Sequence, residues 1–455
     1  MAEIKKQDMG TGSVKRKMVQ LAVPAVVAQV INLLYNIVDR IYIGHIPEIG
    51  AHALTGVGLF TPILMLITAF AMLAGSGGAP LAAIAMGRGE QDRAEKIMGN
   101  CFTVLLLMAV VLTGVFCAFI PELIRLFGGS GNTIPYGVSY GRIYSLGSVF
   151  VLVVMGMNPF ITTQGFAKIS MLTTVIGAVI NIILDPILIF ALDLGVAGAA
   201  IATVLSQAVS AVWILRFLTG KKTMLKLRFG NMILEPGVIL PCLGLGVSSF
   251  VMVSTESILS VSFTSSLFRY GGDVAVGAMT VLTSVNQVIS MPLVGICQGG
   301  QPLMSYNYGA GKLDRVKEAF LCQFTVCVSY AAVFWVLVQL FPSFFAGIFT
   351  NEQALVDYTA WAMRIFLAGC FSVGFQNSCQ QAFVALGQAK ASLFMACLRK
   401  LILLIPLIFI LPNFFQNKAM AVFLAEPVSD ILAAAAATTA FFLFFRRLMK
   451  TGKAE

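Results

Sequence analysis

Polar side chains recur at helical spacing in the apolar stretch 21–44, which reads LAVPAVVAQVINLLYNIVDRIYIG. They follow one another three, four and three residues apart, at Gln29, Asn32, Asn36 and Asp39. This spacing places them along one stripe of an α-helix. A carboxylate at membrane depth costs at least about 2.5–3.5 kcal/mol, so we expect the stripe to face a cavity or a partner helix. The alternative is that Asp39 lies at the helix end, where it pairs with Arg40 or with water.

Other ionisable residues also lie inside apolar runs. Asn181 and Asp185 are four residues apart in 171–192, again on one stripe. Glu256 lies in the middle of its run and Arg399 in the inner half of another. We interpret these buried charges as functional, because charged residues at this depth need a compensating role. For Lys400, Glu426 and Arg364, snorkelling of the charged end to the membrane interface or placement at a helix end is at least as good an explanation as function.

The composition is that of a membrane protein with many spans. Of 455 residues 58% are hydrophobic and 11% are charged, and the mean hydropathy is +0.90. Twelve apolar runs are long enough to cross a bilayer as helices. We therefore predict an all-α integral membrane protein of the cell membrane.

The net charge of +10 does not indicate nucleic-acid binding, because the basic residues alternate between loops. With the N-terminus inside, the basic clusters at 5–17, 88–96, 221–228, 312–317 and 446–453 all fall on one side of the membrane. Cytoplasmic loops are enriched in Lys and Arg. Both termini are therefore predicted to be cytoplasmic.

The chain contains an internal repeat. PLAAIAMGRGEQDRAEK begins at Pro80 and PLMSYNYGAGKLDRVKE at Pro302, an offset of 222 residues. Six helices per half is an even number, so the halves should be parallel repeats about an axis along the membrane normal. The predicted domains are an N-terminal tail (1–17), an N-lobe with six spans (18–218), a cytoplasmic linker (219–238), a C-lobe with six spans (239–445) and a tail (446–455).

Several function classes lack their motifs. The repeated glycine loops follow no strand and have no Walker spacing, so they are interpreted as turns. The two histidines, His45 and His52, lie in one predicted outer loop, which argues against histidine-based metal chemistry and against an enzyme. The sequence contains no filter-like repeat, which argues against a channel. We expect no cofactor and no metal apart from Na⁺ as a coupling ion.

Two parallel lobes of six helices, with Asp39 in the first helix and a polar pair in the fifth, resemble the multidrug and toxic compound extrusion (MATE) family over essentially the whole chain. Within it the DinF-like branch, and the MepA-type multidrug exporters in particular, are most similar. The resemblance implies a cation site in the N-lobe. Its residues here would be Asp39, Asn181, Asp185 and Thr203. The tenth helix has no acidic residue of the kind that the NorM-like branch uses with Glu256, which argues against a second cation site of that type.

The resemblance also implies the function and the partners. It implies efflux of lipophilic or cationic drugs in antiport with H⁺ or Na⁺ by alternating access, in a protein that we expect to be a monomer. Two carboxylates that share a site cannot both stay ionised cheaply, so Asp39 or Asp185 should hold a proton or a cation. The candidate residues for the substrate cavity are Gln29, Asn32, Tyr35, Asn36, Asn158, Glu256 and Arg399.

The main alternative is a flippase for a lipid or a lipid-linked oligosaccharide with the same two-lobed architecture. Such a protein should carry basic residues in its central cavity for a pyrophosphate. Arg399 and Lys400 are the candidates for that role. The sequence leaves open the physiological substrate and the choice between H⁺ and Na⁺.

Overall fold

The computed structural model describes residues 9–349 and 352–451, and within these ranges it consists of helices, turns and loops without a strand. The first half of the chain forms α1 (Val14–Gly44), α2 (Gly50–Gly87), α3 (Gln91–Leu126), α4 (Ile134–Leu146), α5 (Ser148–Thr163), α6 (Ala167–Pro186), the π-helix η1 (Ile187–Ala191), α7 (Gly195–Leu218) and the 3₁₀ turn η2 (Phe229–Met232).

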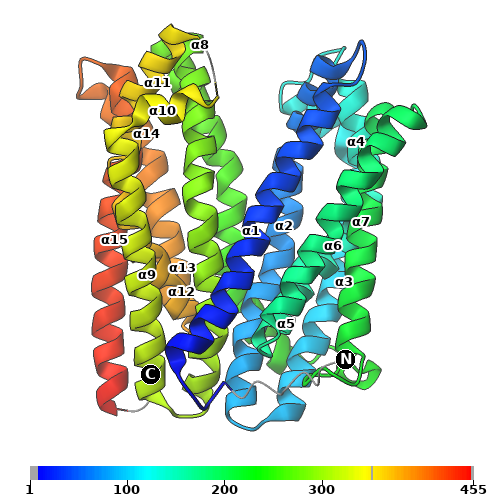
Figure 1. Cartoon of the computed structure of the whole chain (residues 1–455), viewed down its shortest axis with the longest axis vertical. Coiled ribbons are helices and arrows are strands. Elements are labelled where there is room, and N and C mark those ends of the chain that lie inside the picture. Colours follow the sequence, from blue (N-terminus) through cyan, green and yellow to red (C-terminus); the bar gives the residue numbers. More distant parts are fainter. Residues whose placement is uncertain (1–8, 350–351, 452–455) are drawn as a thin grey trace.

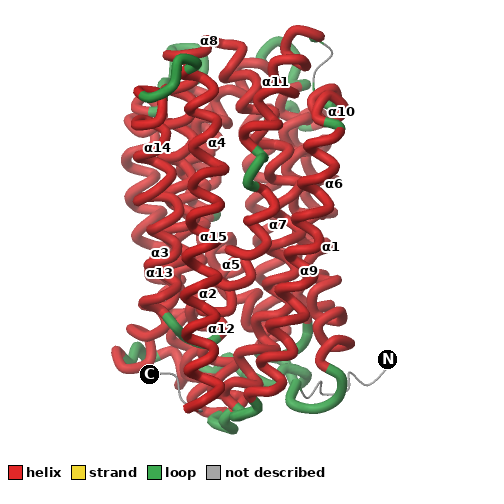
Figure 2. Tube along the Cα trace, turned by 90° about the vertical axis from the view of Figure 1, so that its left-hand side faces the viewer, coloured by secondary structure: helices red, strands yellow, loops and turns green. Residues whose placement is uncertain are grey.

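The second half forms α8 (Pro236–Gly309), α9 (Leu313–Leu340), the short α10 (Pro342–Gly347), α11 (Gln353–Phe366), α12 (Cys370–Ala385), α13 (Ala389–Cys397), the π-helix η3 (Leu398–Leu404), α14 (Ile405–Ile410), the 3₁₀ turn η4 (Leu411–Asn413) and α15 (Lys418–Thr451). The two sets of helices stand side by side as two lobes (Figure 1). Most of the loops lie at the two ends of the bundle (Figure 2).

The described helices make twelve spans. Nine are long and apolar enough to cross a membrane, and two bent pairs, α4 with α5 (56°) and α11 with α12 (47°), make one further span each. α8 makes two, because its backbone leaves the helical region at Gly272 (φ 66°) and both of its ends return to the same part of α2. The predicted fold class, twelve helices in two six-helix lobes, is confirmed.

The repeated glycine loops are tight turns between the second and third spans of each lobe. Gly89 and Gly311 have φ of 80° and 71°, a conformation that strongly favours glycine. Arg315, at the end of the second loop, donates hydrogen bonds to the backbone oxygens of Met9, Thr11 and Gly12 at 2.8–3.2 Å. The segment before α1 is thereby fastened to the C-lobe.

A matching contact fastens the other lobe. The segment before α8 docks on α3 of the N-lobe, where Asn100 Nδ2 donates to Asn231 O (3.2 Å) and Glu235 N donates to Asn100 Oδ1 (2.7 Å). Each lobe therefore holds the segment that leads into the first helix of the other lobe. The buried Gln164 adds to this, because its Oε1 accepts hydrogen bonds from Thr223 Oγ1 and from the backbone N–H groups of residues 224 and 225.

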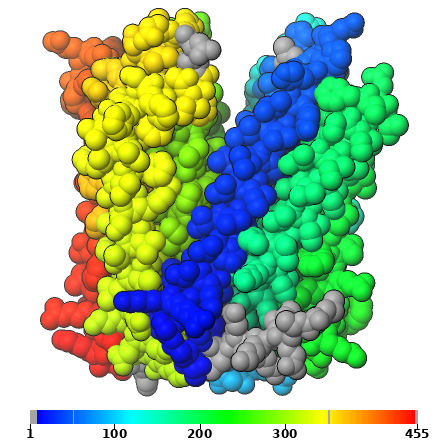
Figure 3. Space-filling model, in the orientation of Figure 1, coloured from blue at the N-terminus to red at the C-terminus, as the bar shows by residue number. Residues whose placement is uncertain are grey.

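The lobes meet at the end where α1 begins and α15 ends (Figure 1). Glycines let the helix backbones approach closely there: a Cβ on Gly295 would lie 2.6 Å from Val26 Cα, and one on Gly77 would lie 2.6 Å from Gly246 N. At the opposite end the surface is notched between the lobes (Figure 3). The molecule is therefore closed at the end where α1 begins and α15 ends, and open at the other.

α1 contacts both lobes. Its first turns pack against the C-lobe core, in which Val14, Met18 and Leu21 are buried. Its second half packs along α6 of the N-lobe. A buried proline, Pro24, lies in the first of these two parts. A change in the N-lobe that displaces α1 would therefore alter the packing at the closed contact between the lobes.

Candidate functional site

Helices α1, α6 and α7 bring the four predicted cation-site residues together inside the N-lobe. Asp39 comes from α1, Asn181 and Asp185 from α6, and Thr203 from α7. All four side chains are buried, and Asp185 and Asn181 are fully shielded. The four-residue step between Asn181 and Asp185 places both on the side of α6 that α1 and α7 cover.

Asn181 is the centre of the hydrogen bonds in this cluster. Its Nδ2 donates to Asp185 Oδ1 (3.2 Å) and to Thr203 Oγ1 (3.4 Å), and Thr203 in turn donates to Ala199 O (3.0 Å). The carboxyl groups of Asp39 and Asp185 are close enough to interact with each other. Arg40 is exposed and forms no ion pair with Asp39 among the described residues, so the helix-end alternative for Asp39 is not what the structure shows.

Three oxygen atoms of this cluster lack a hydrogen-bond donor among the described residues. They are Asp39 Oδ1, Asn181 Oδ1 and Asp185 Oδ2, and all three are buried. A buried acceptor without a donor costs about 1–3 kcal/mol, and more when it is charged. A proton or a small cation would satisfy these oxygens. The set of carboxylate, amide and hydroxyl oxygens therefore fits H⁺ or a hard cation such as Na⁺.

Tyrosines form one wall of the cluster. Tyr35, a predicted cavity residue, and Tyr140 of α4 both lie near Thr203. Tyr144 stacks on Tyr140, with ring centroids 6.0 Å apart, and both rings pack edge-on against Phe60. The sequence reasoning did not include the two α4 tyrosines. Their four-residue spacing in YGVSYGRIY was the available signal.

The remaining candidates of the N-lobe lie in three places. Gln29 reaches the other lobe, where its Nε2 donates to Gln298 Oε1 of α8 (3.0 Å). Asn36 is exposed and donates to the backbone oxygen of Asn32 (2.6 Å). Asn158, in α5, donates to Ser170 O (3.3 Å), while its own Oδ1 is buried without a donor among the described residues.

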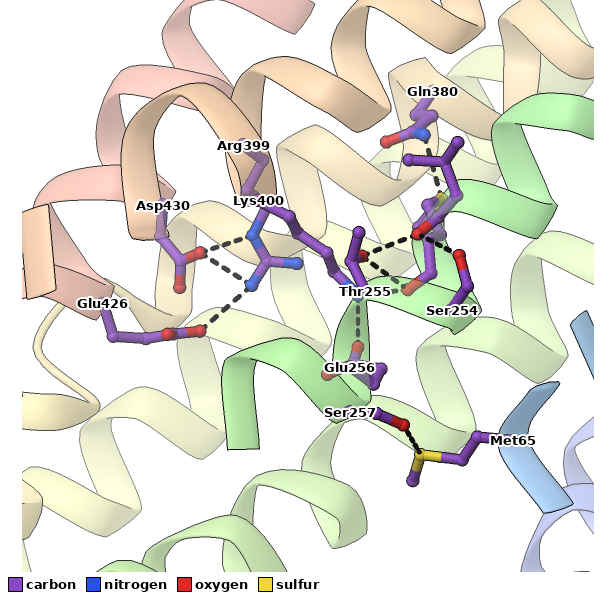
Figure 4. A network of polar contacts seen from close by, with 12 residues as sticks. Met65, Ser254, Thr255, Glu256, Ser257, Gln380, Arg399, Lys400, Glu426 and Asp430 are labelled. Carbon is purple, nitrogen blue, oxygen red and sulfur yellow. Dashed lines mark hydrogen bonds and ion pairs between the residues drawn. The ribbon is translucent and has the colours of Figure 1, made fainter. Parts of the chain in front are cut away.

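The two candidates of the C-lobe belong to a separate network of charges (Figure 4). Arg399 forms ion pairs with Asp430 (2.7 Å) and Glu426 (3.3 Å), and Glu256 forms a close ion pair with Lys400. Snorkelling was one explanation offered for Lys400 and Glu426. It is wrong for both, because their side chains are buried and point to these partners.

Comparison with known proteins gives one family. The MatE family model matches residues 24–187 and, a second time, 247–410. Multidrug export protein MepA of Staphylococcus saprophyticus is 24% identical over 407 residues, which are 89% of this chain and 88% of that protein. MepA of Staphylococcus haemolyticus is 23% identical over 426 residues, 92% of each chain. A solved structure described as the outward-facing conformation of a multidrug resistance MATE family transporter superposes with a TM-score of 0.90 at 23% identity, covering 99% of this chain and 100% of that one.

Proposed function

Because the chain belongs to the MATE family of membrane transporters, we propose that it is a secondary active exporter of lipophilic cations, driven by inward flow of H⁺ or Na⁺. The observation that carries this proposal is the buried N-lobe cluster with three acceptor oxygens that lack a donor among the described residues. The relatives named multidrug export proteins support the substrate class.

The mechanism follows from the position of α1. Asp39 binds the coupling ion in the N-lobe, and the first turns of the same helix pack on the C-lobe at the closed contact. Binding or release of the ion changes the net charge between Asp39 on α1 and Asp185 on α6. The resulting movement of α1, bending near Pro24, opens one end of the space between the lobes and closes the other.

We propose that the closed end is cytoplasmic, on the distribution of basic residues. The described conformation is then outward-open, and the notch in Figure 3 is the exit for the substrate. Each elementary charge that enters across the membrane potential supplies about 2.3 kcal/mol per 100 mV. The protein works as a monomer, since the ion cluster and both walls of the notch come from one chain.

The flippase alternative has less support. It requires free basic groups in the central cavity for a pyrophosphate. The two basic side chains that could serve, Arg399 and Lys400, are both buried and paired with carboxylates. Binding a polyanion there would require breaking these ion pairs.

The test is efflux of ethidium from proteoliposomes with a pH gradient or a Na⁺ gradient imposed separately. The wild-type protein should export with one of the gradients, whereas Asp39→Asn and Asp185→Asn should lose gradient-driven export at matched insertion. Near-normal export in both variants would refute the assigned site. Export with neither gradient, together with scrambling of a labelled lipid, would favour the flippase.

A further inference from the structure

Five charged residues form one network inside the C-lobe (Figure 4). Arg399 and Lys400 are consecutive residues of the π-helix η3, Glu426 and Asp430 are one turn apart on α15, and Glu256 comes from α8. Arg399 Nε donates to Asp430 Oδ1 (2.7 Å), and a terminal nitrogen of Arg399 forms an ion pair with the same oxygen (2.7 Å). The longer contact, to Glu426, is 3.3 Å. None of these five belongs to the N-lobe cation cluster.

Glu256 is the exposed member of this network. Its side chain is 51% exposed, against 15% or less for the four others. Ser260 and Thr264 follow it at four-residue steps and are exposed as well, which makes a polar stripe. The exposed apolar residues Ile258 and Val261 lie on another side of α8, as expected for a lipid-facing surface.

The neighbours of Glu256 along the helix place it between the lobes. The next residue, Ser257, contacts Met65 Sδ of α2 (3.6 Å), and Phe250 packs edge-on against Phe70 of α2 with ring centroids 5.0 Å apart. This part of α8 therefore runs against the N-lobe. We conclude that Glu256 faces the space between the lobes, where a substrate would pass.

The charges of the network do not balance. It contains three carboxyl groups and only two basic groups, so full ionisation leaves one surplus negative charge in a buried site. An uncompensated buried charge costs several kcal/mol. The surplus negative charge lies near Arg399, which forms ion pairs with two carboxyl groups, whereas among the described residues Lys400 forms an ion pair with Glu256 only. Glu426 has the longer contact with Arg399, so it is the carboxyl group that best takes up a proton.

No other described ionisable group near Glu426 supplies the missing positive charge. The groups that act on it are Arg399 and Lys400 from η3, Asp430 from its own helix and Glu256 from α8. The remaining neighbour is the thiol of Cys370 on α12, which is neutral when protonated. The network is therefore complete with one added positive charge, whether from a proton or from a bound cation.

We propose that the C-lobe network exchanges one proton at Glu426 for one monovalent organic cation bound at the exposed side of Glu256. The cation takes the place of the Lys400 ammonium, which turns to Glu426, and the Glu426 carboxyl releases its proton to water. Before the exchange three carboxyl groups are matched by two basic groups and the proton; afterwards they are matched by two basic groups and the cation. The inference rests on the proposed transport of organic cations and adds a second, substrate-linked proton site.

The experiment uses tetraphenylphosphonium as the probe cation and a parent variant in which Asp39→Asn and Asp185→Asn silence the N-lobe cluster. Isothermal titration in buffers of different ionisation enthalpy counts the protons released on binding. We expect about one proton per bound cation at neutral pH, and an affinity that falls about tenfold per pH unit below the titration of the network. In the parent with Glu426→Gln, release should vanish and the affinity should become independent of pH.

The exposed acid Glu122 on α3 provides the matched control, since Glu122→Gln should leave proton release unchanged. Binding without proton release and without pH dependence in the parent overturns the proposal, and this outcome needs no Glu426 variant. Equal release with and without Glu426→Gln overturns it as well. Normal proton release in the parent, together with failure of the wild-type protein to export with either gradient, would refute the proposed function alone.

Discussion

A methyl group added to Gly246 should open the closed contact between the lobes. The Cβ of Gly246→Ala would meet the carbonyl oxygen of Leu73 on α2 and lie 2.7 Å from its carbonyl carbon, where ordinary contacts begin at 3.4 Å. The backbones must therefore separate by at least about 0.7 Å. Overpacking of this kind costs about 1–3 kcal/mol. If the opposite conformation lacks this contact, the cost shifts the equilibrium toward it by about 5- to 150-fold.

The shift can be measured at the open end, where His52 of α2 and Asp273 of α8 are both exposed. Spin labels at these two positions, in a background with Cys117, Cys322 and Cys397 replaced by serine, report the distance across the notch. Double electron–electron resonance should show a shorter distance in Gly246→Ala, because the open end closes when the closed end opens.

Gly244→Ala is the matched control. Its Cβ would meet no atom within 4 Å, and it lies two residues away on the same helix. A distance distribution that is the same in both variants would refute the reasoning. It would mean either that the lobes absorb the methyl group locally or that they do not exchange between two conformations.

Three further predictions follow from other contacts. Because Asp39 and Asp185 share one site, the Asp39→Asn, Asp185→Asn double variant should be little worse in gradient-driven ethidium efflux than either single variant, and additive losses would contradict a shared site. Gln164→Ala removes the acceptor of three hydrogen bonds from the linker, so it should lower stability by about 1–3 kcal/mol. Tryptic cleavage at Lys221 and Lys222 should become faster, and unchanged cleavage would contradict this role of Gln164. Arg399→Met leaves two buried carboxyl groups without their basic partner and should cost about 3–5 kcal/mol, measured as a lower Tm. Adding Glu426→Gln and Asp430→Asn should restore most of that loss.

The sequence predicts the fold well because its signals are local. Each apolar run and each basic loop depends on residues close together in the chain, and the repeat is found by comparing two such local segments at an offset of 222 residues. The sequence also predicts residues of the N-lobe cluster from local spacing, because Asp39 lies on a polar stripe of α1, and Asn181 and Asp185 lie on one of α6. The structure brings Asp39, Asn181, Asp185 and Thr203 together; that they bind the coupling ion stays a prediction.

The C-lobe network could not be predicted in this way. The partners of Arg399 lie 27 and 31 residues away on another helix, and the partner of Lys400 lies 144 residues away. The π-helical winding of η3 adds a further difficulty, because its hydrogen bonds between residues five apart widen each turn and shift side chains from the directions that a 3.6-residue period gives. From the sequence alone, Lys400 at a helix interior therefore looked able to snorkel.

The two lobes thus share one architecture but carry different charge balances, and this difference bears on the driving force. Among the described residues, the two carboxylates of the N-lobe cluster form no ion pair with a basic side chain, so each ion that the cluster carries inward moves net charge across the membrane. The proposed C-lobe exchange replaces one substrate charge by one proton and moves none. Membrane potential, worth about 2.3 kcal/mol per charge per 100 mV, should therefore act on transport only through the N-lobe. If so, a variant that lacks Asp39 and Asp185 should lose gradient-driven export but still release a proton when it binds tetraphenylphosphonium, and this exchange should be insensitive to voltage.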